Sequence, residues 1–200
     1  DLTDCTFEAN EAEIAGGALY LSSSAEMTCT GCIFEDNVSE QAGAVEIVAG
    51  AAYIDAGGVY TDNEATEDEG GAIRLSDEGA LSIVDAELSG NTAARSGGAI
   101  YLEEPDGTVT IEGCSLQSNQ TSTGDGGAIH ATDDAEISLI DTDLIDNEAG
   151  SDGGAVAIEG GSLSIVGGEV SDNLADDGGA IYAELVDELL VSGVSLTGNE

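Results

Sequence analysis

The segment that decides the fold is residues 97–119, which read GGAIYLEEPDGTVTIEGCSLQSN. It opens with the GGAI of Gly97–Ile100 and closes with a leucine three positions before Asn119. Between these ends, Val109 and Ile111 alternate with polar residues, which is the period of a β-strand with one buried face. The segment therefore predicts short strands joined by tight turns.

The same pattern returns along the whole chain. An asparagine that follows a large apolar residue by three positions recurs at Asn10, Asn37, Asn63, Asn91, Asn119, Asn147, Asn173 and Asn199. The intervals are 27, 26, 28, 28, 28, 26 and 26 residues, with a mean of 27. Such a period is typical of solenoid repeat proteins. We therefore expect one elongated domain over residues 1–200, built from about seven rungs and forming a segment of a longer repeat protein.

Two further columns define the turns and the core. The apolar residues three positions before each asparagine are Phe7, Phe34, Tyr60, Leu88, Leu116, Leu144, Val170 and Leu196, and we expect them to point inward. Six positions before each asparagine the chain has Asp4, Gly31, Gly57, Asp85, Gly113, Asp141, Gly167 and Gly193. Only residues that tolerate a positive φ recur there, so this column predicts a tight bend.

The predicted fold is all-β. Each rung carries three short strands, and no segment shows the sustained 3.6-residue apolar period of a helix. Stacking equivalent strands about 4.8 Å apart gives a single-stranded parallel β-helix about 34 Å long. The usual hand of parallel crossovers makes it right-handed.

The charge balance restricts the partners. The chain has 42 Asp and Glu residues against two Arg and no Lys, which gives a formal net charge of −40. Nucleic acid is excluded, since phosphates are bound through Lys and Arg, and anionic membrane surfaces are disfavoured for the same reason. No apolar run is long enough to cross a bilayer, so we expect no direct membrane insertion by this segment.

The asparagine column has two interpretations: a ladder of side chains that hydrogen-bond inside a turn, or a ligand site. Asparagine tolerates the left-handed conformation and bonds to its own backbone at turns, and stacked β-structures favour asparagine ladders. The structural role is the favoured one for all eight residues.

Acidic residues recur just before the Gly-Gly pairs, at Glu69, Asp125, Asp152 and Asp177. Rung stacking predicts a row of carboxylates, and neighbours about 5 Å apart repel each other by roughly 1 kcal/mol in water. Calcium prefers such oxygen ligands. These four residues are therefore candidate calcium ligands and calcium is the candidate cofactor; a solvated acidic rim adapted to high salt is the alternative.

Three of the four cysteines, Cys5, Cys32 and Cys114, lie five positions before a repeat asparagine. Small residues fill this position in the other rungs, which indicates an inward slot. Cys5 and Cys32 are in adjacent rungs, close enough for a disulfide. Buried free thiols are the alternative, and a redox or zinc role lacks the second ligand pair that it needs.

Many β-helix proteins cleave acidic polysaccharides, so an enzyme is one of the functions that the predicted fold allows. Arg74 and His130 share an outward column but lie two rungs apart, and neither has a partner that the sequence reveals. A variable, exposed column accounts for them, and the net charge repels anionic sugars. We therefore expect no catalytic residues and no enzyme activity, with a carbohydrate-active lyase or hydrolase as the alternative function.

The repeat resembles that of chlamydial polymorphic outer-membrane proteins. The GGAI of residues 70–73, 97–100 and 126–129 matches one half of that family's motif, and the Phe-x-x-Asn of residues 7–10 and 34–37 matches the other. Leu, Tyr or Val replaces Phe from the third rung onward. The resemblance covers the chain and implies a right-handed β-helix at the cell surface with a role in adhesion.

These observations together predict a structural or adhesive extracellular surface protein. Its β-helix would act as a rigid stalk or fibre subunit, and uncapped rungs at both ends would stack head to tail into filaments. The expected partners are a second copy of the chain, or a protein or glycan of a host or cell surface. A calcium-dependent binding module for carbohydrate or protein is a further alternative.

Overall fold

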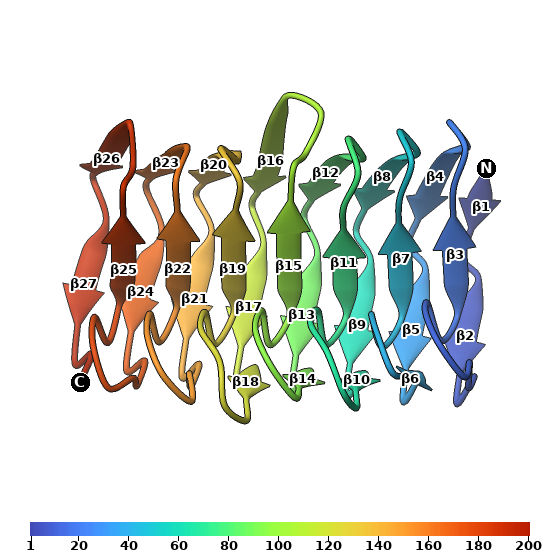
Figure 1. Cartoon of the computed structure of the whole chain (residues 1–200), viewed down its shortest axis with the longest axis horizontal. Helices are drawn as coiled ribbons and strands as arrows, with labels where there is room; N and C mark the ends of the chain where they lie inside the picture. Colours follow the sequence, from blue (N-terminus) through green and yellow to red (C-terminus); the bar gives the residue numbers. More distant parts are fainter.

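The computed structural model describes residues 1–200 and consists of β-strands, turns and bends without any helix. The strands stack into parallel sheets along one axis (Figure 1). In Figure 1 the front strands run upward, the chain returns behind them, and each rung moves from the N-terminus at the right toward the C-terminus at the left, so the coil is right-handed. The predicted parallel β-solenoid of about seven turns is confirmed.

Three sheets, named here from their place in Figure 1, form the walls of the solenoid. The top sheet contains Leu2–Thr3 (β1), Glu26–Thr30 (β4), Ala52–Ala56 (β8), Ala80–Val84 (β12), Thr108–Glu112 (β16), Glu136–Ile140 (β20), Ser162–Val166 (β23) and Glu188–Ser192 (β26). The back sheet contains Thr6–Glu8 (β2), Ile33–Glu35 (β5), Val59–Thr61 (β9), Glu87–Ser89 (β13), Ser115–Gln117 (β17), Asp143–Ile145 (β21), Glu169–Ser171 (β24) and Ser195–Thr197 (β27). The front sheet contains Leu19–Leu21 (β3), Val45–Ile47 (β7), Ile73–Leu75 (β11), Ile100–Glu103 (β15), Ile129–Thr132 (β19), Val156–Glu159 (β22) and Ile181–Glu184 (β25).

A fourth, short sheet was not predicted. It contains Val38–Ser39 (β6), Glu64–Ala65 (β10), Thr92–Ala93 (β14) and Gln120–Thr121 (β18), each directly after a repeat asparagine. Isolated parallel bridges at Glu11, Glu148 and Leu174 continue the same column into the other rungs. Two-residue strands are too short to show an alternating pattern, so periodicity does not predict them.

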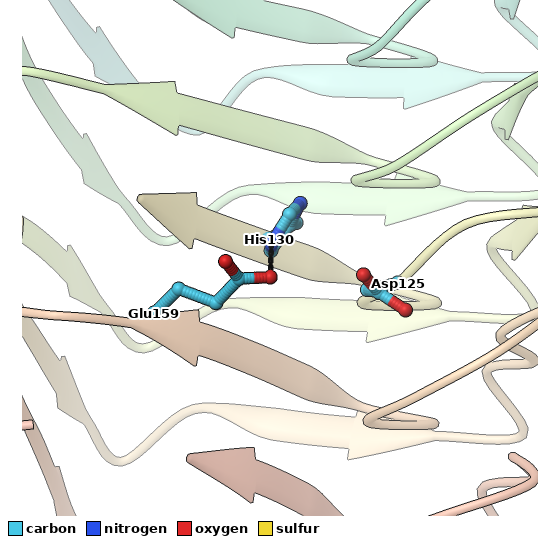
Figure 2. A group of neighbouring side chains, drawn as sticks. All are labelled: Asp125, His130 and Glu159. Carbon is cyan, nitrogen blue, oxygen red and sulfur yellow. Dashed lines mark ion pairs between the residues drawn. The ribbon is translucent and has the colours of Figure 1, made fainter. Parts of the chain in front are cut away.

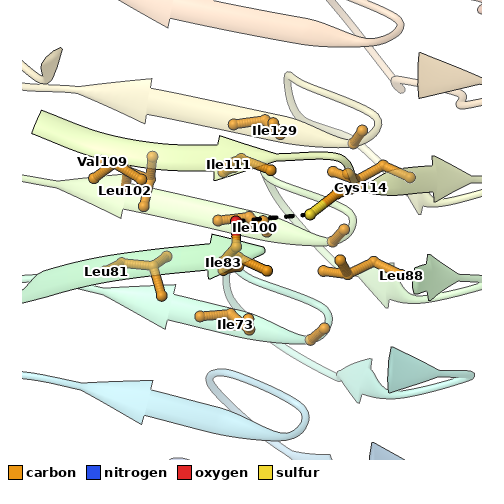
Figure 3. Close-up of a cluster of buried hydrophobic side chains, with 14 of the residues drawn as sticks. Ile73, Leu81, Ile83, Leu88, Ile100, Leu102, Val109, Ile111, Cys114 and Ile129 are labelled. Carbon is orange, nitrogen blue, oxygen red and sulfur yellow. Dashed lines mark hydrogen bonds between the residues drawn. The ribbon is translucent and has the colours of Figure 1, made fainter. Parts of the chain in front are cut away.

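The core is a single cluster of 37 buried residues that runs along the axis. Equivalent residues of adjacent rungs are paired in register, for example Ile83 with Ile111, and Ile111 with Leu139. Figure 3 shows these columns as stacked Ile, Leu and Val side chains between the sheets. Each fully buried Leu or Ile contributes about 2 kcal/mol, so stability accumulates rung by rung.

The turns follow the predicted bend column. All eight of its residues have positive φ, including the non-glycine residues Asp4, Asp85 and Asp141 at 50°, 53° and 46°. In the Gly-Gly pairs the first glycine has a positive φ, as at Gly70 with 73°. The second has no room for a side chain, because a Cβ on Gly71 would overlap the carbonyl oxygen of Gly98 in the next rung. Close stacking of the rungs therefore explains the Gly-Gly signature.

No helix of the kind that could span a membrane occurs in the structure.

Candidate functional site

The outer face of the front sheet carries the polar side chains that depart most from the repeat. One outward residue from each rung forms its central column, which consists of Tyr20, Glu46, Arg74, Tyr101, His130, Ala157 and Tyr182. The column was interpreted as exposed, and this was wrong for its middle. Glu46, Tyr101 and His130 are only 1%, 8% and 5% exposed. Arg74 contacts both Glu46 and Tyr101, and Tyr101 packs against His130.

Arg74 is the centre of a charge cluster. Its Nη1 donates to Glu46 Oε1 at 2.6 Å and its Nη2 to Glu103 Oε2 at 3.2 Å, while Nε lies 3.6 Å from Glu69 Oε2. The guanidinium carbon also lies 5.6 Å from the centroid of the Tyr101 ring. The partners of Arg74, which the sequence did not reveal, are therefore three carboxylates from three rungs.

At two of these carboxylates, Glu46 and Glu69, burial has a larger effect on the pKa than the charge of Arg74. Desolvation raises the pKa of Glu46 to about 7, although Arg74 opposes the shift. Burial and the neighbouring Asp68 likewise raise the pKa of Glu69 to about 7. The ion pairs of these two acids with Arg74 are therefore expected to weaken as the pH falls below about 7.

Glu69 belongs to this arginine cluster rather than to the aspartate row. Arg95 Nη1 lies 2.9 Å from Asp68 Oδ1 and 3.9 Å from Glu69 Oε1, so Glu69 stands between both arginines of the chain. In the stacked column, Ser96 separates Glu69 from Asp125, and its hydroxyl accepts the backbone N–H of Asp125. The structure therefore does not bring Glu69 together with the other three candidate calcium ligands.

Asp125, Asp152 and Asp177 do form a row on successive rungs. The backbone N–H of Asp152 donates to Asp125 Oδ1 at 3.0 Å, and Asp152 pairs with Asp177 through a parallel bridge. Partial desolvation and the charges of Asp125 and Asp177 raise the pKa of Asp152. Calcium binding at this row stays a prediction.

Sequence reasoning missed the arrangement around His130. Its ring packs edge-on against Tyr101, with centroids 5.5 Å apart, and its Nε2 lies 3.7 Å from Glu159 Oε1. Figure 2 shows the imidazole between the carboxylates of Glu159 and Asp125, and one ligand atom from each of the three residues lies within 4.8 Å of the others. Burial lowers the pKa of His130. The spacing of these three residues in the sequence does not predict that they lie together, because they come from a turn and from two strands of different rungs.

The eight repeat asparagines form a continuous hydrogen-bonded column. Each Nδ2 from Asn10 to Asn173 donates to the Oδ1 of the next asparagine at 2.8–3.0 Å. That Oδ1 also accepts the backbone N–H of the preceding asparagine at 2.9–3.1 Å. From Asn37 onward, Nδ2 gives a second bond to the carbonyl of the large apolar residue one rung back, at 2.9–3.0 Å. The six inner amides are thus fully paired and leave no group for a ligand.

The four cysteines are free thiols in the structure, so a Cys5–Cys32 disulfide is not formed there. Cys29, Cys32 and Cys114 are buried. Burial raises the pKa of Cys29 to about 12 and that of Cys114 to about 11, which makes these two thiols poor nucleophiles at neutral pH.

One acid lies inside the core. Asp55 occupies a column that holds Ile83 and Ile111 in the following rungs, and it is fully buried. Its Oδ2 accepts the backbone N–H of Gly58 at 3.1 Å, whereas Oδ1 has no hydrogen-bond partner. Desolvation raises its pKa to about 6. The sequence carries a visible signal for this site, an aspartate in an apolar column.

The fold and this face together define a class: a right-handed parallel β-solenoid repeat protein with a polar, partly buried outer column on one wall. Within that class, the Chlamydia polymorphic membrane protein repeat is the family whose sequence model matches, at residues 85–103. The matched segment contains Asn91 and the GGAI of Gly97–Ile100, the two halves of the predicted motif, so the expected resemblance is confirmed. No curated protein and no solved structure matches the chain.

Proposed function

We propose that this chain is a rigid spacer in an extracellular surface protein, where its β-solenoid forms part of a stalk or fibre that holds an adhesive face away from the cell. The observation that carries the proposal is the unbroken asparagine column. The surface location is supported by the matched repeat, whose family is described as membrane proteins.

The rigidity follows from the hydrogen bonds. Bending the axis would lengthen the ladder bonds on one side of the column, and each buried amide left unpaired costs about 1–3 kcal/mol. The sheets resist bending in the same way, since their backbone bonds also run between rungs. A stack of this kind keeps its length and direction, which is what a spacer requires.

The two ends of the stack are complementary. At one end Asn10 Oδ1 accepts no hydrogen bond, and at the other the backbone N–H of Asn199 and one proton of its Nδ2 have no acceptor. The last rung also exposes apolar side chains of its core columns, with Leu189, Val191 and Leu196 at 46%, 38% and 47%. We propose that two copies can pair as adjacent rungs do, with Asn199 Nδ2 of one copy donating to Asn10 Oδ1 of the next, in the way that Asn173 donates to Asn199.

The sheets limit how two copies can join. The top and back sheets have eight strands, but the front sheet has seven. If Asn199 of one copy bonds to Asn10 of the next, the place of one front strand between them stays empty. Appending a copy of residues 12–21 after Glu200 supplies that strand, because Asn199-Glu200 repeats Asn10-Glu11.

This extended chain tests the stacking. We expect it to form linear oligomers in sedimentation experiments at high salt, which screens the net charge of −40. Adding Leu196→Lys to the extended chain should abolish them, because a lysine would be buried at the junction, and the exposed Glu87→Lys is the matched control. An extended chain that stays monomeric at high salt would refute head-to-tail stacking.

The adhesive face is proposed to be the front sheet. Its outer column varies from rung to rung while the inner columns keep the same residue types, and Tyr20 is 57% exposed beside a depression of about 290 Å³ that Arg74 also lines. The strongly acidic surface favours a basic protein surface as the partner. Binding of the purified chain to cells should fall with rising salt and with Tyr20→Ala, and unchanged binding in both tests would remove this assignment.

A further inference from the structure

His130 is buried without a hydrogen-bond partner. It is the only histidine of the chain, it is 5% exposed, and neither Nδ1 nor Nε2 makes a hydrogen bond. An imidazole in this position leaves a donor and an acceptor unpaired, which costs about 1–3 kcal/mol for each group. Buried polar side chains in folded proteins nearly always have a hydrogen-bond or metal partner. The unpaired imidazole of His130 therefore indicates a bound partner from outside the chain.

Two carboxylates converge on this ring from neighbouring elements. Asp125 precedes Gly126 in the turn before β19, and the backbone N–H of Asp152 fixes one of its oxygens. Glu159 ends β22 in the next rung, two positions after Ala157 and therefore on the same face. Ala157, which pairs with His130 between adjacent rungs, has a small side chain, and Figure 2 shows the Glu159 side chain reaching toward His130.

The spacing suits one metal ion. One ligand atom from each of Asp125, His130 and Glu159 lies within 4.8 Å of the other two, and the His130 Nε2 to Glu159 Oε1 distance is already 3.7 Å. Ligands about 2.1 Å from a tetrahedral zinc ion lie about 3.4 Å apart, so rotamer adjustments of roughly 1 Å would close the site.

We infer that Asp125, His130 and Glu159 bind a divalent transition-metal ion of the zinc type, with the remaining coordination position open to solvent. The imidazole selects this class over calcium, which takes oxygen ligands, while zinc accepts both imidazole and carboxylate. Of the three proposed ligands, Glu159 also lines a depression of about 460 Å³ beside Tyr101.

The local charge favours a cation at this place. Besides desolvation, the negative charges of Asp125, Glu184 and Asp133 raise the pKa of Glu159. A bound divalent ion offsets this repulsion. Because its ligands come from β19, β22 and the turn before β19, the ion also joins two adjacent rungs of the front sheet. This site differs from the predicted calcium row because one of its ligands is a histidine and because only Asp125 belongs to both.

The single histidine makes the site directly observable. We propose to titrate the chain, labelled with ¹⁵N in its histidine, with zinc chloride in excess calcium, which occupies weaker acidic sites. One equivalent of zinc should shift the His130 ring resonances, and cobalt(II) should give the absorption bands of a tetrahedral complex. Imidazole resonances that do not move with zinc would overturn the inference.

Variants separate the site from general acidity. His130→Gln, Asp125→Asn and Glu159→Gln should each weaken zinc binding more than about tenfold, since even changes to residues beside metal ligands cost 10–100-fold. Glu184→Gln is the matched control. Glu184 lies one rung further on and pairs with Glu159, so the substitution removes an equal charge but no proposed ligand.

Thermal unfolding provides the second readout. Zinc should raise the melting temperature of the wild-type chain and of Glu184→Gln, but not that of His130→Gln, whose circular dichroism checks that it folds. Equal zinc affinity of the wild type and His130→Gln, or an equal rise in both melting temperatures, would show adventitious binding to carboxylates and refute the site.

Discussion

Replacing Asp55 by asparagine should stabilise the protein at alkaline pH. The aspartate lies within an otherwise apolar column, and only one of its carboxylate oxygens has a hydrogen-bond partner, the N–H of Gly58. Asparagine has nearly the same shape, keeps an oxygen for that N–H and carries no charge. The substitution therefore removes the buried charge while leaving the packing in place.

The magnitude follows from the pKa of Asp55, which rises from 3.8 to about 6 on folding. The unfolded chain loses this proton near pH 4 and the folded chain only near pH 6, so the stability associated with Asp55 is lost as the pH rises between these values. Above pH 6 the charged form costs about 3 kcal/mol. At pH 4.5, just above the isoelectric point of about 4.1, the cost falls to about 1 kcal/mol.

Urea unfolding of both proteins at pH 4.5 and pH 8 measures this difference. We expect Asp55→Asn to be more stable than the wild type by about 3 kcal/mol at pH 8 and by about 1 kcal/mol at pH 4.5. Glu87→Gln removes one charge from an exposed strand position and serves as the control, with no comparable gain. A stability difference that does not change with pH, or a loss of stability at pH 8, would refute the reasoning.

Three further substitutions test other parts of the structure by chemical unfolding. Asn119→Ala removes a fully paired inner amide and should lower the free energy of unfolding by about 3–5 kcal/mol, whereas Asn10→Ala at the open end should lower it by about 1 kcal/mol. Equal costs would argue against the asparagine ladder. Gly71→Ala should prevent the close stacking of adjacent rungs and destabilise the protein severely. Gly57 has open space around it, so Gly57→Ala should cost only about 1 kcal/mol, because of the positive φ at this position. A larger loss of stability in Gly57→Ala than in Gly71→Ala would contradict the packing. Arg74→Met should cost about 3–5 kcal/mol of stability at pH 8, because it leaves the buried Glu46 carboxylate without its cation. The cost should be smaller at pH 5, since the pKa of Glu46 is about 7 and the acid is then protonated. A cost independent of pH would contradict the pairing.

The fold was predictable because the repeat shows the same physical constraint eight times. A single Asp85 indicates little, but aspartate or glycine in every rung at that position predicts a positive φ, and the structure has it each time. The same repetition predicted the inward residues, such as Val109 and Ile111, which are buried. The fourth sheet was not predicted, because its two-residue strands are too short to show an alternating pattern.

The polar face was harder to predict because its chemistry lies in the exceptions. Whether Arg74 or His130 is buried depends on the side chains of neighbouring rungs and on the turns beside them, which no column of the repeat describes. Glu159 approaches His130 from the next rung, so their contact depends on the residues of two rungs together. Asp55, by contrast, was visible as an aspartate in an apolar column, and comparing each residue with its column would have found it.

Electron microscopy of the native protein on intact cells, with an antibody against residues 1–200, tests the central claim most directly. The claim that this chain is a rigid segment of a surface stalk predicts label on straight projections of uniform width outside the cell. Label confined to the cell interior, or label on compact particles without projections, would contradict it.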